Sequence, residues 1–300
     1  MGRPKFAIAL AAYNGIPWIG EQVETILAQQ GVDVTIFISV DKSTDGTERW
    51  VKDRARIEPR IVMLPPVGRL GGAGKNFFRL LRDIDLTGFD YLALADQDDL
   101  WFKTKLLRAH KIIQAVGVDA YSSNVVAFWP DGRELLVNKS QPQREWDFLF
   151  ESAGPGCTYV FTNAVARALK GLVQSRWDEL DDVWLHDWLF YAYVRASGHS
   201  WYIDKKPGLR YRQHDANQIG VNRGWHSLRH RLDKIRSGFA RLQCQKVALI
   251  AGVDPEVPIM RALFNKGWAG NLFLALSVCK TRRSLGGRMV MFAVCTLNLF

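Results

Sequence analysis

The chain has 300 residues, 48% of them hydrophobic, which is the content of a globular protein with one large domain or one domain and an appendage. Its net charge of +10 is unevenly placed, because residues 205–300 carry 17 Lys and Arg against 4 Asp and Glu. The four cysteines lack the spacing of a zinc site or a disulfide framework, and the apolar run at residues 6–12 is too short for a signal segment. We therefore expect a cytoplasmic protein with reduced thiols and a basic partner surface in its last third.

The first hundred residues alternate between strand and helix signals. Strands are expected over residues 6–12, 34–40, 61–64 and 91–95, and helices over residues 18–29, from about residue 48, and over 75–82. This alternation predicts an α/β fold with a mostly parallel sheet covered by helices. Such sheets bind nucleotides at the carboxyl ends of their strands, where Tyr13, Asp41 and Asp96 fall.

The rest of the chain is predicted to be mixed at first and helical at the end. A further strand is expected over residues 120–128, a glycine-opened loop over 154–161, a helix over 183–195, and short extended segments over 201–203 and 209–211. Mostly helices are expected beyond Gly220, with a boundary within residues 213–224. The predicted domains are thus residues 1–220 and a basic helical region of residues 221–300.

An acidic cluster, Asp96-Gln97-Asp98-Asp99, ends the strand over residues 91–95. On an extended backbone Asp96 and Asp98 share a face, and two such carboxylates repel each other unless a cation joins them. Hard oxygen ligands suit Mg²⁺ or Mn²⁺, which complete their coordination with substrate phosphates. The alternative interpretation is a solvated acidic turn that caps a helix beginning near Phe102.

Two apolar stretches near the C-terminus, residues 268–279 and 289–300, are too short to cross a membrane, which needs roughly 20 apolar residues. Four cations stand between them: Lys280, Arg282, Arg283 and Arg288. This pattern favours helices that lie in an anionic membrane surface with their apolar faces inward. A small helical packing subdomain is the alternative.

Five short motifs follow one another along the chain. They are Tyr13-Asn14-Gly15, Asp41-x-Ser43-Thr44-Asp45-Gly46-Thr47, Asp96-Gln97-Asp98-Asp99-x-Trp101, His186-Asp187-Trp188, and the stretch from Tyr211-Arg212-Gln213-His214 to Asn217 and Gly220. The series resembles the family 2 glycosyltransferases of the GT-A fold, and most closely their bacterial rhamnosyltransferase-like branch. The resemblance covers residues 6–220 and implies a nucleotide-sugar-binding domain that transfers a sugar with inversion.

The resemblance implies roles for the matching residues. Asp187 matches the catalytic base, Asp96 and Asp98 match the metal-binding motif, and His214 is a metal or diphosphate contact. On the donor side stand Tyr13, Asp41, Asp96 and Arg212, and on the acceptor side Gly156, His186 and Trp188. Val40 departs from the pattern, because many relatives have a second Asp before the position of Asp41.

The chemistry of inverting transfer agrees with these roles. The reaction needs a carboxylate that accepts the proton of the acceptor hydroxyl and a positive centre on the departing diphosphate. Asp187 supplies the first and Asp98 with its metal the second. The two groups must approach the anomeric carbon from opposite sides, and they come from well-separated segments.

Structural explanations compete with several of these assignments. Asp187 is alternatively a helix cap, and His214 a structural histidine. The glycines before Lys75 do not form an ATP loop, because Arg69 and Asn76 occupy positions that need Gly and Ser or Thr. Lys75 is expected near the donor instead. Trp101, Trp184 and Trp188 are expected either to stack on sugar rings or to pack in the core.

The predicted function is transfer of a sugar from a nucleotide diphosphate, with dTDP-L-rhamnose favoured and UDP-sugars left open. The acceptor is a cell-surface polysaccharide such as O-antigen or a lipid-linked glycan, at the inner face of the cytoplasmic membrane. Two rivals are a metal-dependent phosphohydrolase, suggested by His186-Asp187 and His214-Asp215, and a non-enzymatic nucleic-acid-binding protein, suggested by the basic tail. The first would be all-helical, and in the second the acidic cluster would repel the ligand, so no nucleic-acid partner is expected.

Overall fold

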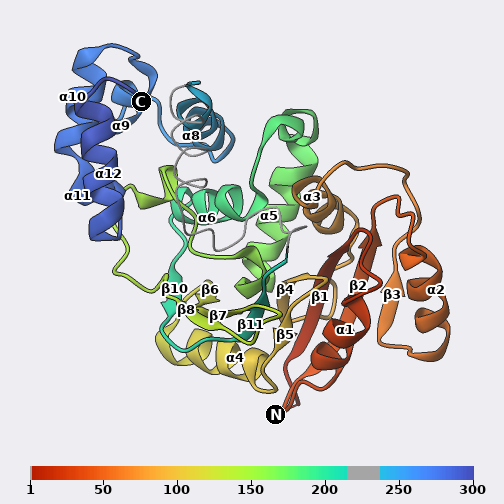
Figure 1. The fold of residues 1–300 in the computed structure, drawn as a ribbon. Coiled ribbons are helices and arrows are strands. Elements are labelled where there is room, and N and C mark those ends of the chain that lie inside the picture. The colour runs from red at the N-terminus through yellow and green to blue at the C-terminus, as the bar shows by residue number, and fades with distance from the viewer. Residues whose placement is uncertain (1, 215–236) are drawn as a thin grey trace. The chain divides into compact units, whose positions relative to one another are not determined.

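The computed structural model describes residues 2–214 and 237–300, and these form two compact units (Figure 1). The described residues of the first unit are 2–140, 154–182 and 199–214, and those of the second are 141–153, 183–198 and 237–300. The predicted boundary after Gly220 lies outside the described residues, as do Asp215, Asn217 and Gly220 of the fifth motif.

The first unit is built on a seven-stranded sheet of order β10-β6-β9-β4-β1-β2-β3. The strands are β1 (Lys5–Ala12), β2 (Asp33–Val40), β3 (Ile61–Met63), β4 (Tyr91–Asp96), β6 (Ala120–Ser123), β9 (Val160–Thr162) and β10 (Trp201–Asp204). Pairing is parallel except at β9, which runs antiparallel to both β4 and β6. The predicted mostly parallel sheet is confirmed, and it excludes the all-helical phosphohydrolase.

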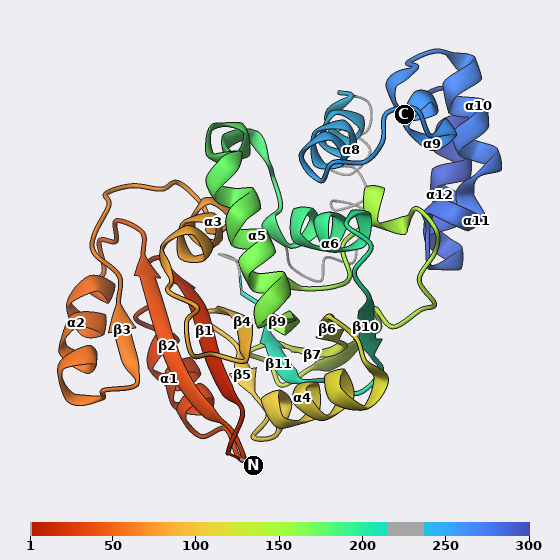
Figure 2. The same cartoon turned by 180° about the vertical axis from the view of Figure 1, so that it is seen from behind.

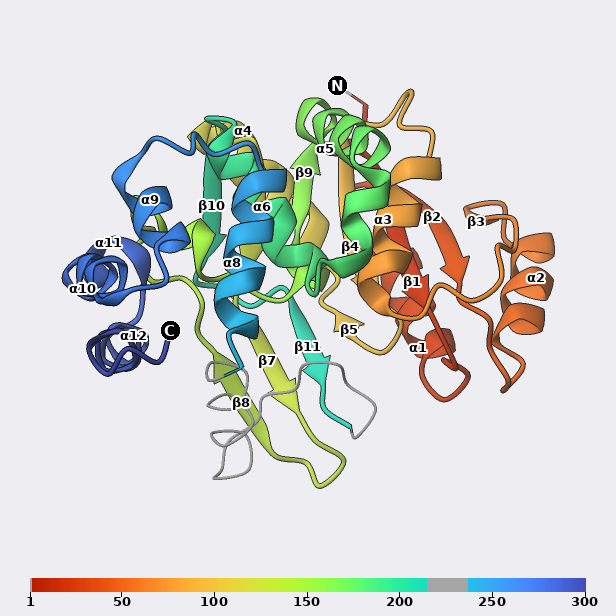
Figure 3. The ribbon, with the colours of Figure 1, turned by 90° about the horizontal axis from the view of Figure 1, so that it is seen from above.

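Helices cover both faces of this sheet, and their apolar stripes explain where they lie. The helices of the first unit are α1 (Ile19–Leu27), α2 (Thr47–Ile57), α3 (Ala73–Asp83), α4 (Lys105–Val116) and α5 (Asn163–Ser175), with 3₁₀ turns η2 (Gly156–Thr158) and η3 (Trp177–Asp182). Ile19, Val23 and Ile26 of α1 share a core with Phe6 and Ile8 of β1. Helices α3 and α5 pack together and contact the sheet (Figures 2 and 3). A sheet covered on both faces needs strands that are apolar throughout, as β1 is.

The single strand predicted over residues 120–128 is wrong, because the chain leaves the sheet at Asn124. Strand β6 ends at Ser123, and β7 (Val125–Phe128) joins a second sheet of order β5-β11-β7-β8, with β5 (Leu100–Trp101), β8 (Glu134–Val137) and β11 (Leu209–Arg212). The buried Asn124 side chain donates to Lys205 O at 2.9 Å and accepts from the Lys139 amide at 2.7 Å. These bonds fix the corner between the two sheets.

The acidic cluster does not cap the following helix. Residues Leu100–Trp101 pair with β11, so the helix expected near Phe102 begins at Lys105. Its N-cap is Thr104, which makes no side-chain capping bond. The alternative interpretation of the acidic residues as a capping turn is therefore wrong.

The second unit is helical. Helices were predicted beyond Gly220, and the described residues of that region, 237–300, confirm this. Its helices are α6 (His186–Ala196), α8 (Phe239–Ile250), α9 (Pro258–Phe264), α10 (Trp268–Leu276), α11 (Val278–Thr281) and α12 (Leu285–Thr296), with a 3₁₀ turn η1 (Asp147–Leu149). Helix α6 begins three residues later than predicted. No helix within the described ranges is both long and apolar enough to span a bilayer.

The cysteines are free, as predicted from their spacing. Cys157, Cys244 and Cys295 are buried, and Cys279 is exposed. The buried thiols lie in packed surroundings, and burial raises the pKa of Cys244 to about 12. A buried thiol with a raised pKa is chemically inert.

Asp204, at the end of β10, joins three elements of the first unit through one buried carboxylate. It accepts two bonds from Arg108 of α4, at 2.5 and 3.0 Å, and one from the Tyr121 hydroxyl of β6 at 2.9 Å. Burial alone would raise the pKa of Asp204, but the hydrogen bonds from Arg108, Lys206 and Tyr121 outweigh it and hold the pKa below its usual range. The ionised carboxylate therefore contributes to stability.

Asp204→Asn is expected to lower the free energy of unfolding at pH 7 by about 1–3 kcal/mol, because it weakens a bond to a charged donor. Since the native pKa is lowered, the carboxylate's contribution is present above the unfolded pKa near 3.9 and is lost as the pH falls through the native value. The difference between wild type and variant should therefore shrink below about pH 4. Denaturant unfolding between pH 7 and pH 3.5 measures it. The exposed Asp131→Asn, which removes a pair with Arg133, is the control, and an equal loss in both variants would contradict the assignment.

Candidate active site

The predicted metal-binding motif lies at the carboxyl edge of the seven-stranded sheet. Asp96 is the last residue of β4 and pairs in register with Ala11 of β1, so it stands beside the loop that follows β1. Asp98 and Asp99 follow before the chain enters β5. Three carboxylates are thus concentrated where parallel sheets bind their ligands.

Strand β11 brings two further predicted residues to this edge. His214 Nε2 lies 2.8 Å from Asp98 Oδ2, and the two side chains are only 14% and 15% exposed. Arg212 donates from Nε to the main-chain oxygen of Asp98 at 2.8 Å. The structure therefore brings His214 and Arg212 to the acidic cluster across more than a hundred residues of sequence, although the Arg212 guanidinium holds the protein's own main chain.

Asp99 and Cys157 lie close to Asp96 in the interior of the first unit. Ligand atoms of Asp96, Asp99 and Cys157 all lie within 4.8 Å of one another, and both Asp99 and Cys157 are completely buried. Burial, reinforced by the charges of Asp98 and Asp96, raises the pKa of Asp99 well above its usual range. Sequence reasoning gave neither residue a role. The third carboxylate of the motif was the available signal for Asp99, but nothing in the sequence marked Cys157.

The donor set of this cluster fits a divalent cation. Neighbouring carboxylates repel one another, and the charges of Asp98 and Asp96 add to burial, the larger cause, in raising the pKa of Asp99. A cation held by Asp96, Asp98 and His214 would remove that repulsion with oxygen and imidazole ligands, which suit Mg²⁺ or Mn²⁺. The Cys157 thiol is a softer ligand, and burial raises its pKa well above the usual range, so it is a poorer candidate.

The main chain around the cluster is fixed by polar side chains that the sequence did not reveal. The Gln97 carboxamide accepts from Tyr13 N and donates to Tyr13 O, both at 2.8 Å. Gln22 of α1 is buried and donates to Asp96 O at 2.9 Å. A Cβ at Gly15 would displace the Gln97 carboxamide from its two bonds to Tyr13. The loop after β1 and the acidic loop therefore form one hydrogen-bonded unit.

The first two sequence motifs also interlock. Ser43 Oγ accepts from Asn14 N at 3.0 Å, Thr47 Oγ1 accepts from Gly15 N at 2.8 Å, and Asp45 accepts from Ile16 N at 3.0 Å. The residues that carry the family-like pattern thus hold the loop on which Tyr13 lies. The Tyr13 side chain is 53% exposed, as an aromatic ring that stacks on a ligand must be.

Asp41 and Lys75, both predicted near the donor, engage other parts of the protein. The buried Asp41 carboxylate accepts from the main-chain amides of Lys42, Leu70 and Gly71 at 2.7–2.8 Å, so it fastens the loop before α3. Lys75, in the first turn of α3, pairs with Asp181 at 3.0 Å. Their roles toward a ligand stay predictions.

Trp101 and Gly156 of the first unit are buried. The Trp101 side chain is 4% exposed, and Lys105 Nζ lies 3.2 Å from the centre of its ring. Gly156 opens η2 directly before Cys157. The burial of Trp101 favours the packing alternative over contact with an acceptor sugar.

The fourth motif belongs to the second unit, at the start of α6. Asp187 lies in the first turn, where its Oδ1 accepts from Trp188 N at 2.7 Å. Trp188 is buried and donates from its indole nitrogen to Phe148 O at 2.9 Å, which favours a packing role. Burial lowers the pKa of His186 to about 3, so its ring is neutral at physiological pH. The first turn of a helix favours a negative charge, which suits an ionised Asp187.

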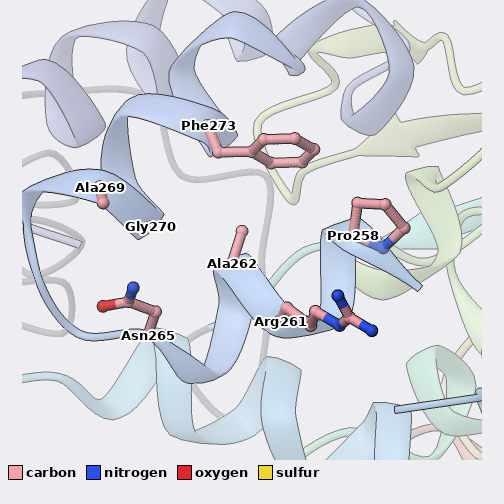
Figure 4. Close-up of a pocket in the computed structure, with 7 residues that line it drawn as sticks. All are labelled: Pro258, Arg261, Ala262, Asn265, Ala269, Gly270 and Phe273. Atoms are coloured by element: carbon pink, nitrogen blue, oxygen red, sulfur yellow. The ribbon is translucent and has the colours of Figure 1, made fainter. Parts of the chain in front are cut away.

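A groove of about 240 Å³ in the second unit has none of this chemistry (Figure 4). It lies between α9 and α10 and is lined by Pro258, Arg261, Ala262, Asn265, Ala269, Gly270 and Phe273. Its charged lining residue, Arg261, pairs with Glu256 at 2.5 Å. With no carboxylate among the lining residues, the groove offers neither a base nor a metal site.

The chain is similar in sequence to known glycosyltransferases. The model of the family described as "Glycosyltransferase like family 2" matches residues 4–137. The dTDP-rhamnosyl transferase RfbG of Shigella flexneri is 41% identical over 292 residues, which are 97% of this chain and 100% of that protein.

Solved structures share the fold at lower identity. S. aureus TarS 1-349 in complex with UDP has a TM-score of 0.55 at 14% identity, over 98% of this chain and 90% of that chain. The mannosyltransferase PcManGT from Pyrobaculum calidifontis, in complex with GDP-Man and Mn²⁺, has a TM-score of 0.54 at 21% identity, over 99% of this chain and 81% of that chain. The predicted GT-A fold is confirmed.

Proposed function

The chain belongs to the family 2 glycosyltransferases, and we propose that its donor is dTDP-L-rhamnose. That it is a glycosyltransferase that uses a nucleotide sugar follows from the family. The observation that carries the choice of donor is the 41% identity, over nearly the whole of both chains, to a protein named a dTDP-rhamnosyl transferase. A UDP-sugar is the alternative donor.

The donor site is proposed at the carboxyl edge of the first unit's sheet. Tyr13 and Asp41 would contact the base, and Lys75, Arg212 and Asp96 would lie along the diphosphate. Asp98, Asp96 and His214 would hold Mg²⁺ or Mn²⁺, with Mn²⁺ favoured by the ion in one structural relative. When bound, the cation supplies positive charge to the departing diphosphate. The 2.8 Å approach of His214 to Asp98 supports this assignment. In the described residues the ligand atoms of Asp96 lie close to those of Asp99 and Cys157, so Asp96 would have to turn toward the Asp98–His214 pair.

Asp187 is proposed as the base that accepts the proton of the acceptor hydroxyl. A carboxylate can do so only when it is ionised, and the first turn of α6 favours the charged form. Gly156, His186, Trp101 and Trp188 are the residues predicted on the acceptor side. Since the rings of Trp101 and Trp188 are buried, each would contribute by holding the local structure of its own unit.

A panel of nucleotide sugars tests the donor and the metal together. With Mn²⁺ present, dTDP-L-rhamnose is expected to raise the unfolding temperature more than UDP-glucose, UDP-GlcNAc or GDP-mannose, because a ligand at 100 times its Kd stabilises by about 2.7 kcal/mol. EDTA should abolish this shift. Asp98→Asn, which removes charge and keeps size, should weaken it, whereas the exposed Asp53→Asn should not. A larger rise in unfolding temperature with a UDP-sugar would show that the UDP-sugar is the donor. An unchanged rise in EDTA would contradict a role for the metal in donor binding.

Asp187→Asn is expected to lower turnover by about 10²- to 10⁴-fold, since general base catalysis contributes that much. Donor affinity should stay within twofold of wild type, because the group acts on the acceptor. Transfer of labelled sugar to a lipid-linked glycan extract gives turnover, and the thermal shift gives donor affinity. Asp178→Asn, an exposed neighbour in the chain, is the control. Lost donor binding with retained turnover would assign Asp187 to the donor site.

The second unit is proposed to lie on an anionic membrane surface and so to meet a lipid-linked glycan acceptor at the inner face of the cytoplasmic membrane. Helices α10 and α12 pack together and expose Trp268, Leu272, Phe273, Leu276, Leu285, Met289, Val290 and Phe292. We call these eight residues the apolar face. Residues 257–300 contain six Lys and Arg and no Asp or Glu. Arg261, Lys280 and the buried Arg283 have acidic partners in the same unit. The attraction to anionic lipid headgroups would therefore come from Lys266, Arg282 and Arg288 beside the exposed apolar side chains.

Sedimentation with vesicles tests this surface. Binding to vesicles containing phosphatidylglycerol is expected, with release by salt, because attraction between exposed charges is screened within about 8 Å at physiological ionic strength. Leu276→Glu with Met289→Glu should abolish binding, whereas Leu136→Glu, an exposed site in β8, should not change it. If the protein bound neutral vesicles equally well and salt did not release it, an electrostatic contribution to membrane binding would be contradicted. If the double variant instead converts a dimer to a monomer in sedimentation velocity, the face is covered by a second copy.

A further inference from the structure

Trp18, the N-cap residue of α1, lies flat against a predicted metal ligand. Its indole ring and the His214 imidazole are stacked with centres 4.0 Å apart and an angle of 11° between their planes. The same imidazole places Nε2 at 2.8 Å from Asp98 Oδ2. The stack therefore restricts the ring rotation that sets where Nε2 points.

Glu21, one turn further along α1, is linked through Arg212 to the other proposed ligand, Asp98. Its Oε2 accepts from an Arg212 terminal nitrogen at 2.5 Å, and Arg212 donates from Nε to Asp98 O at 2.8 Å. The Arg212 guanidinium also lies 4.8 Å from the centre of the Phe128 ring. The guanidinium is thus oriented by a carboxylate at one end while its Nε–H holds the main chain of Asp98.

We propose that Trp18 and Glu21 are positioning residues that set the geometry of His214 and Asp98 before a cation binds. The inference rests on the proposed metal role of Asp98 and His214. Trp18 and Glu21 lie outside the five motifs. Within the part of the chain that the structure describes, neither side chain bonds directly to Asp96, Asp98 or Asp99. Each acts through one partner on β11 or directly after it: Trp18 through His214 and Glu21 through Arg212.

The physical basis is preorganisation. A metal site gains affinity when the residues behind its ligands fix their orientation, because less conformational freedom is lost as the ion binds. Two of the proposed ligands come from distant segments, Asp98 after β4 and His214 after β11. Helix α1 bonds to the acidic loop as well, through Gln22, so its first turns form a common support for both segments.

Titration of the full-length protein with Mn²⁺, without nucleotide, tests the proposal. Free Mn²⁺ is followed by its electron paramagnetic resonance signal, which does not depend on catalysis. Trp18→Ala is expected to weaken Mn²⁺ binding about twofold to tenfold, as expected from the loss of an aromatic stack. Glu21→Gln is expected to weaken it about twofold to fivefold, the range for a partly exposed ion pair. Trp18→Phe, which keeps a ring over His214, should recover most of the loss.

Two control variants, one on α1 and one on α2 where it contacts α1, separate positioning from general destabilisation. Glu24→Gln removes a carboxylate of α1 that pairs with Arg54. Trp50→Ala removes an indole that packs beside Gly20 of α1. Neither variant removes a side chain that stacks on His214 or pairs with Arg212 among the contacts of residues 2–214 and 237–300. Mn²⁺ affinity should therefore stay within the error of wild type even where thermal unfolding shows a loss of stability.

The outcomes distinguish this inference from the proposed function. If wild type does not bind Mn²⁺, the metal role fails. If wild type binds Mn²⁺ and both the Trp18→Ala and the Glu21→Gln variants bind it equally well, the metal role stands and the positioning inference is overturned. An equal loss of affinity in the Glu24→Gln and Trp50→Ala controls would also overturn it, because the effect would then be one of stability.

Discussion

The repulsion among three carboxylates at the end of β4 is the constraint on which the site depends. Asp96, Asp98 and Asp99 lie within four residues, and burial together with the neighbouring charges raises the pKa of Asp99. Such a group would spread apart if its backbone were free. The backbone is fixed instead, by Gln22 on Asp96 O, by the two bonds between Gln97 and Tyr13, and by Arg212 on Asp98 O. The side chains are thus held close to one another by bonds to their main chain, and such preorganisation favours cation binding.

The first three sequence motifs are joined to one another in the structure. The loop after β1 is tied to the loop after β2 by Ser43, Asp45 and Thr47, and to the acidic loop by Gln97. Parallel pairing of β1 with both β2 and β4 brings those three loops to the same edge. A change in one loop therefore disturbs the other two, so the sequence pattern reflects a shared hydrogen-bonded surface as much as direct contact with a ligand.

The sequence predicted most of what is local and periodic. The strands from β1 to β4 and the first three helices were expected within a few residues, because a buried parallel strand is apolar throughout and its covering helices have an apolar stripe. The turn at Asn124 was missed, since a side-chain amide that bonds to Lys139 and Lys205 leaves no mark on apolar periodicity. Trp18, Glu21, Gln22 and Cys157 were missed for the same reason: their significance lies in partners distant in sequence. The proximity of His214 to Asp98 was predicted only through the family resemblance.

Asp41 combines three bonds to the main chain with its proposed contact to the base of the donor. Its carboxylate accepts three main-chain N–H groups, from Lys42, Leu70 and Gly71, and these bonds hold the loop before α3 against the end of β2. A carboxylate has about four acceptor sites, so three bonds leave capacity for one more donor. The imide N–H of a pyrimidine base is such a donor, and it could bond to Asp41 without releasing the loop. A base contact at Asp41 is therefore compatible with the structural bonds, and the loop before α3 would be held in place while the base binds.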